Sequence, residues 1–94
     1  GGASATEIGR RLARLAESSQ VIVVTHLAQV AAFATNHLVV EKGTDGSVTT
    51  SNVRLVHADD RAREMARLLS GSPDSEVALA HAHELLEAAH GRWE

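Results

Sequence analysis

The sequence predicts a single α/β domain over residues 1–94, whose sheet is incomplete without strands from another segment. Residues 21–24, "VIVV", are apolar and mostly β-branched without alternation, which is typical of a parallel strand covered on both faces. A hairpin pattern follows at residues 38–56, and helical periodicity surrounds both features. One covered strand beside one antiparallel hairpin cannot close a doubly covered sheet. We therefore expect the missing strands to come from elsewhere.

The first element should be a helix. Ser4 and Glu7 have the spacing of a capping box, in which the serine hydroxyl accepts a first-turn amide hydrogen bond and the carboxylate reaches back to the cap. Apolar residues then recur at helical spacing, at Ile8, Leu12, Leu15 and Ala16. The basic residues away from this face are Arg10, Arg11 and Arg14. We interpret them as a solvated charged face, with contact to DNA or to a partner protein as the alternative.

The predicted buried strand leads into Thr25 and His26. Helical spacing then resumes, which predicts a short helix with apolar residues at Leu27, Val30, Ala31 and Ala34. In parallel α/β sheets, ligands bind beyond the carboxyl ends of the strands, and His26 stands at such an end. A histidine there can donate a hydrogen bond to a phosphate oxygen. On this local argument alone, a structural histidine is the better interpretation.

Residues 38–56 predict a β-hairpin. Residues 38–42 form its first arm, and "GTDG" at residues 43–46 is a turn rich in residues that tolerate positive φ. The second arm, residues 47–56, carries apolar residues of shifting parity. This shift indicates a bulge or a strand end near Asn52.

Two helices should close the chain. Asp59 is a suitable cap for a helix that runs through Leu69, and Gly71 supplies its left-handed stop. The apolar stripe of this helix is Ala62, Met65, Ala66 and Leu69. Pro73 suits the first turn of the last helix. The apolar side of that helix is lined by Ala78, Ala82, Leu85, Leu86 and Ala89.

The composition argues against several classes of protein. The formal net charge of −3 argues against a chain that binds DNA electrostatically over its whole surface. One Phe and one Trp are too few for a surface on which nucleic-acid bases stack. The chain has no cysteine, so it has neither a disulfide nor a thiolate metal site. No apolar run is long enough to span a bilayer. We expect a soluble, cytoplasmic protein with no membrane contact.

The histidines of the last helix raise the question of a metal site. His83, Glu87 and His90 share one face of the predicted helix. However, His81 and His83 are two positions apart and point to different sides, and the segment lacks the HExxH order. We interpret these residues as a solvated helix face and expect no metal site.

Several segments resemble, in the same order, the carboxy-terminal end of the RecN family, the SMC-like ATPases of bacterial double-strand break repair. They are "VIVVTHLAQVAAFATNHLVVEK", "GSVTTSNVRLV", "REMARLLSG" and "SEVALAHAHELLE". The opening "GG" with "EIGRRLARLA" resembles the stretch after the Walker B acidic pair and the D-loop of that family. The resemblance covers essentially the whole chain. It implies that residues 1–94 are the latter part of an ABC-type nucleotide-binding head, a partial head lobe.

In such heads ATP lies between two subunits. The resemblance therefore implies ATP and Mg²⁺ as cofactors, the amino-terminal half of the same head and a second head as partners, and DNA bound through the complete, nucleoid-associated protein. By position, His26 would be the switch histidine at the γ-phosphate and the attacking water, and Gly1 and Gly2 would end the D-loop at the dimer interface. Gln29 is placed to line the same site, although a solvent-facing glutamine is at least as good an interpretation. Ala28 stands where the family commonly has proline, a change that removes no phosphate donor.

The motifs that bind nucleotide in such heads do not occur in the sequence. It contains no GxxxxGK[ST] P-loop, no acidic pair after an apolar strand and no signature serine-glycine segment. We therefore expect that this chain by itself neither binds nor hydrolyses ATP. Two alternatives stay open. One is a lobe of another ABC-type ATPase, such as a transporter subunit, which would share His26, and the other is a non-catalytic interaction module with a structural histidine.

Overall fold

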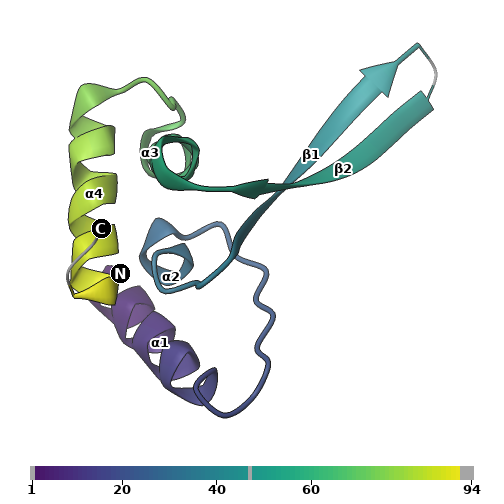
Figure 1. Ribbon diagram of the computed structural model, residues 1–94. Helices are drawn as coiled ribbons and strands as arrows, with labels where there is room; N and C mark the ends of the chain where they lie inside the picture. The colour runs from purple at the N-terminus through teal and green to yellow at the C-terminus, as the bar shows by residue number, and fades with distance from the viewer. Residues whose placement is uncertain (1, 47, 92–94) are drawn as a thin grey trace.

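Four helices and one β-hairpin make up residues 2–46 and 48–91, the part of the chain that this computed structural model describes (Figure 1). The elements are α1 (Gly2–Leu15), α2 (Ala28–Ala31), β1 (His37–Asp45), β2 (Val48–Val56), α3 (Ala58–Ser70) and α4 (Glu76–His90). The hairpin extends away from the helices (Figure 1). This mixture of helices and strands confirms the predicted partial α/β fold.

Helix α1 begins two residues before Ser4, its predicted cap. The capping box is therefore wrong, because Ser4 lies inside the first turn. Glu7 instead pairs with Arg10 (2.6 Å) and Arg11 (3.2 Å), since guanidinium groups one turn further along offer a charged partner. These pairs are exposed, and so is Arg14, which supports the interpretation of a solvated charged face.

Residues 21–24, the predicted buried strand, form no regular element in the structure. Ile22 is 82% exposed and Val24 is 99% exposed. The prediction of a covered strand is therefore wrong for this chain by itself. The physical reason is that a strand needs a hydrogen-bonded neighbour, and the sheet of the described residues consists of β1 and β2 only.

The predicted hairpin is confirmed. Its antiparallel register is continuous from His37 opposite Val56 to Asp45 opposite Val48. Strand β1 is longer than predicted, so residues 43–45 belong to it rather than to the turn. Strand β2 ends at Val56, as predicted. The chain reverses after Asp45 with Gly46 at a φ of +66°, a conformation that favours glycine.

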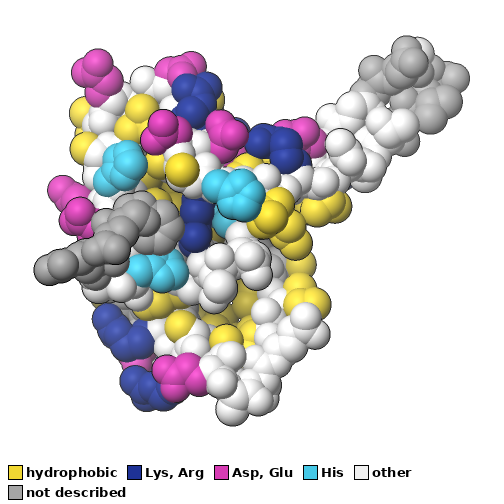
Figure 2. Space-filling model, viewed as in Figure 1, with side chains coloured by type: hydrophobic (Ala, Val, Ile, Leu, Met, Phe, Trp, Pro, Cys, Tyr) yellow, Lys and Arg dark blue, Asp and Glu magenta, His cyan; other side chains and the backbone are white. Residues whose placement is uncertain are grey.

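The predicted bulge near Asn52 is wrong, because Asn52 faces Glu41 within the continuous register. The apparent shift of parity arises because both faces of the hairpin base are apolar. One face is buried, at His37, Val39 and Val56. The opposite face carries the exposed cross-strand pairs Leu38–Leu55 and Val40–Val53. Figure 2 shows hydrophobic side chains on the half of the hairpin nearer the helices.

Helices α2, α3 and α4 pack around a small core (Figure 1). Its buried residues are Ala28, Ala32, Met65, Ala82 and Leu86. The alanines allow the helices to approach closely, while Met65 and Leu86 are the largest fully buried side chains. The predicted apolar faces of the last two helices are thus confirmed. Within the described residues, no helix is both long and apolar enough to cross a membrane.

For α3 and α4, the predicted carboxyl end of α3 is correct, but the predicted starts of both helices are wrong. Gly71, with a φ of +82°, ends α3 as predicted. Helix α3 begins one residue before Asp59, so Asp59 lies in the first turn and does not cap it. Helix α4 begins after Ser75, whose Oγ accepts a hydrogen bond from the backbone N–H of Ala78 (3.2 Å). The prediction that Pro73 lies in the first turn is therefore wrong. Pro73 lies in the connection before α4, because Ser75 caps the helix.

Gly9 allows α1 to pack closely on the segment of α2. A Cβ at this position would overlap the Phe33 ring and lie 3.2 Å from the carbonyl oxygen of Gln29. We expect Gly9→Ala to lower the free energy of unfolding by about 1–3 kcal/mol in urea denaturation, because the two segments must separate. Gly2→Ala is the matched control, since its Cβ would lie 3.8 Å from Gln29 Nε2, an ordinary contact. Equal stability of the two variants would contradict this packing.

Candidate functional site

His26 is an exposed residue in the turn before helix α2. The Oγ1 of Thr25 accepts a hydrogen bond from the backbone N–H of Leu27 (3.0 Å), which closes the turn around the histidine. Ala28, the first residue of α2, is 2% exposed and belongs to the core. The His26 side chain therefore stands at the surface, while the backbone two residues later is fixed by packing.

Helix α2 is held at its other end by Arg61 of α3 and His90 of α4. The Nη2 of Arg61 donates hydrogen bonds to the carbonyl oxygens of Ala31 (3.2 Å), Ala32 (3.2 Å) and Ala34 (2.7 Å). The Nε2 of His90 lies 2.8 Å from the same Ala32 oxygen, which it reaches as a donor when it carries the ring proton. The last carbonyls of a helix have no intrahelical partners. These two side chains therefore add to the carboxyl end of α2, where the Ala31 oxygen also accepts a hydrogen bond from the backbone N–H of Ala34 (3.1 Å).

Gly2 and Gln29, two of the predicted site residues, lie at the contact between α1 and α2. A Cβ on Gly2 would lie 3.8 Å from Gln29 Nε2, so the glutamine amide is directed toward α1. Gln29 is partly buried, unlike the exposed His26. The structure thus brings Gly2 and Gln29 together, whereas His26 lies on the exposed turn that precedes α2. Gly1 lies outside the described residues.

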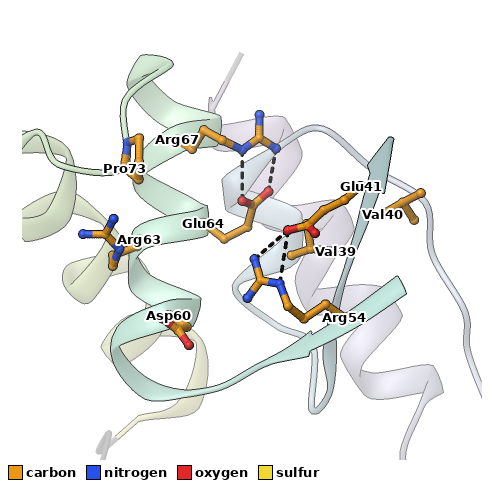
Figure 3. Close-up of a pocket in the computed structure, with 9 residues that line it drawn as sticks. All are labelled: Val39, Val40, Glu41, Arg54, Asp60, Arg63, Glu64, Arg67 and Pro73. Carbon is orange, nitrogen blue, oxygen red and sulfur yellow. Dashed lines mark hydrogen bonds and ion pairs between the residues drawn. The ribbon is translucent and has the colours of Figure 1, made fainter. Parts of the chain in front are cut away.

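A shallow pocket of about 410 Å³ lies between the hairpin and α3 (Figure 3). The predicted site residues do not line it. Each arginine at its wall has a carboxylate partner: Arg54 with Glu41 (2.9 Å), Arg67 with Glu64 (2.5 Å) and Arg63 with Asp74 (2.6 Å). The carboxylates raise the pKa of Arg54 and Arg67. The positive charges of this pocket are therefore already balanced, and it does not have the character of a phosphate site.

Arg61, a further residue of this region, is not among the predicted site residues. Its side chain is 4% exposed, and burial lowers its pKa. The sequence contains a signal for it, because Arg61 stands one turn before Met65 on the apolar stripe, where a cation needs a buried partner. His90 also contributes to structure, while His83 and Glu87 on the same helix are exposed. In the described parts of the chain, no group of three or more His, Cys, Asp or Glu could hold a metal ion.

His37, at the start of β1, is 8% exposed, and its Nδ1 has no hydrogen-bond partner among the described residues. Burial lowers the pKa of His37 below its ordinary value, and the positive charge of Arg61 lowers it further. Glu64 acts in the opposite direction, with a smaller effect. The folded chain therefore favours the neutral imidazole.

The chain is similar to proteins named DNA repair protein RecN. It is 63% identical to that of Streptomyces coelicolor over 89 residues, which cover 95% of this chain and 16% of the relative. It is 58% identical to the Mycobacterium leprae protein over 90 residues (95% and 15%) and 54% identical to the Deinococcus radiodurans protein over 86 residues (92% and 15%). No protein-family model matches the chain. The matches confirm the resemblance found in the sequence, and the chain spans about one-sixth of the length of these relatives.

We expect the stability of the chain to decrease as the pH falls from about 7.5 to about 5.5. The unfolded state, in which His37 has a pKa near 6.5, takes up a proton before the folded state does. The contribution of His37 is thus complete above about pH 6.5 and is lost as the pH falls through its lower folded pKa. His37→Gln should reduce this pH dependence of the thermal midpoint.

The control for this measurement is His81→Gln, because His81 is an exposed histidine of α4. It should retain the pH dependence of the unmodified chain. If His37→Gln and His81→Gln lose stability equally over this pH range, the buried neutral state of His37 is contradicted.

Proposed function

We propose that this chain, which matches RecN DNA repair proteins over 95% of its length, is one part of an SMC-like ATPase head. The complete head would act in DNA double-strand break repair and recombination. The names of the relatives support the repair role. ATP hydrolysis at an interface between two heads, with His26 as the switch histidine, is the finer part of the proposal, and the resemblance of the sequence motifs supports it.

The observation that carries the proposal is the uncovered apolar surface that leads to His26. Residues 21–24 have the composition of a core strand, yet Ile22 is 82% exposed and Val24 is 99% exposed. One face of the hairpin base is uncovered as well. Contiguous apolar surface of this kind indicates an interface, and the relatives are about six times as long as this chain. We infer that the amino-terminal half of the same head supplies the strands that cover it.

In the completed head, His26 would follow a paired strand, at the edge where parallel α/β sheets bind ligands. Phosphoryl transfer is catalysed mostly by positioning and by stabilisation of charge on the transferred group. An imidazole N–H of His26 would donate a hydrogen bond to the γ-phosphate and help to orient the attacking water. The exposed side chain and the fixed backbone of α2 support this role.

ATP and Mg²⁺ would be held mainly by segments outside this chain. Mg²⁺ would balance the phosphate charge, but the described residues offer no cluster of ligands that fits it. Gly1 and Gly2 would lie at the interface with the second head of an ATP-dependent dimer, and Gln29 would line the nucleotide site. DNA would be bound by the complete protein, which we place in the cytoplasm in association with the nucleoid.

The test is a full-length chimera in which this chain replaces the matching segment of Streptomyces coelicolor RecN, to which it is 63% identical. We expect the chimera to hydrolyse ATP and His26→Ala to lower its kcat by about 10²–10³-fold, the loss typical of removing one donor to a developing charge. His83→Ala is the matched control, because His83 is an exposed histidine on α4. It should leave kcat unchanged.

Two results would count against the proposal. If His26→Ala and His83→Ala hydrolyse ATP equally fast in the chimera, His26 is not the switch histidine. If this chain hydrolyses ATP without the rest of the head, the site is not shared with another segment.

A further inference from the structure

We propose that Arg61 is a positioning residue for His26: it holds the carboxyl end of α2 and thereby fixes the turn that carries the histidine. The inference rests on the proposed function of His26. It adds a buried residue of α3 that acts through the position of α2 rather than on the nucleotide.

Helix α2 cannot determine its own position. It contains four residues, Ala28–Ala31, and has no side-chain cap at its start. A helix of this length is unstable by itself, because nucleation costs more than a few backbone hydrogen bonds return. Contacts with the rest of the chain must therefore fix its place. They comprise the packing of α1 at Gly9, the core packing of Ala28 and the hydrogen bonds at the carboxyl end.

Arg61 makes the more extensive of the polar contacts at that end. Its Nη2 reaches the carbonyl oxygens of Ala31, Ala32 and Ala34 at 2.7–3.2 Å. The two N–H groups of Nη2 are thus shared among three carbonyl oxygens at and just beyond the end of α2. The Nε2 of His90 lies 2.8 Å from one of these oxygens, that of Ala32. Removal of the Arg61 cation would take this donor from the partly buried Ala34 oxygen, whereas the Ala31 oxygen would keep the backbone N–H of Ala34 (3.1 Å) and the Ala32 oxygen would keep its contact with His90.

The path from this contact to His26 is short and continuous. Arg61 holds one end of α2, and Ala28 at the other end belongs to the same buried core as Met65 of α3. The hydrogen bond from Leu27 N–H to Thr25 Oγ1 then closes the turn around His26. A shift of α2 would move the histidine, and catalytic groups misplaced by about 1 Å can lose about a hundredfold in rate.

The experiment measures ATP hydrolysis of the full-length chimera with Arg61→Gln, alone and combined with His26→Ala. Arg61→Gln should lower kcat at least about tenfold with the KM for ATP within about twofold, because the residue places a group that acts on the transferred phosphate. The double variant should be no slower than His26→Ala, since Arg61 acts through that side chain. Arg63→Gln is the matched control, because Arg63 is an exposed arginine of α3 paired with Asp74. It should retain the full kcat.

Arg61→Lys covers the case in which Arg61→Gln fails to fold. The lysine ammonium keeps the positive charge and N–H donors but lacks the planar geometry of the guanidinium group. We therefore expect a kcat between that of the unmodified chimera and that of His26→Ala, at a similar KM for ATP. An unchanged kcat in Arg61→Lys would then overturn the proposal.

The remaining outcomes separate this inference from the proposed function. If His26→Ala loses activity while Arg61→Gln keeps it, only the positioning role is wrong. If the double variant is slower than His26→Ala by the full factor of Arg61→Gln, Arg61 acts on stability or on another group, and the inference is also wrong. If His26→Ala keeps full activity, both proposals are wrong.

Discussion

The hydrogen bonds between Arg61 and the carboxyl end of α2 determine where the candidate site stands. A four-residue helix has no stable position of its own, and a buried guanidinium is unfavourable unless it is paired with acceptors. The contact meets both requirements, because carbonyl oxygens at and just beyond the end of α2 receive hydrogen bonds from a buried cation that needs acceptors. His90 adds a second contact at the same oxygen of Ala32. These contacts from α3 and α4, together with the packing of α1 at Gly9, hold the segment of α2 that follows His26.

This arrangement changes the interpretation of residues 21–24. Their composition suggests a rigid strand that directs His26 at a ligand, but in the described chain they form no strand and Val24 is 99% exposed. The backbone after His26 is therefore held by the packing of α2, whereas the backbone before it, at residues 21–24, is not held in a sheet. Pairing with strands from another segment would supply the second constraint, so completion of the sheet and completion of the site would be the same event.

Local sequence predicts the features of this fold that depend on neighbouring residues. The hairpin, the apolar stripes of the last two helices and the stop at Gly71 all follow from short-range patterns. The helix starts do not, because Ser4 and Asp59 are good caps by local rules and lie inside their helices. His26 could be singled out from the apolar run before it, whereas the role of Arg61 could not, since its acceptors lie 27 to 30 positions away.

The central claim is that residues 21–24 become a paired strand only in the complete protein. Hydrogen exchange of their backbone amides, compared between this chain and the full-length chimera, tests it most directly. The account predicts fast exchange in this chain and strong protection in the chimera, with the amides of the α3 core protected in both. Equally fast exchange of residues 21–24 in the chimera would contradict it.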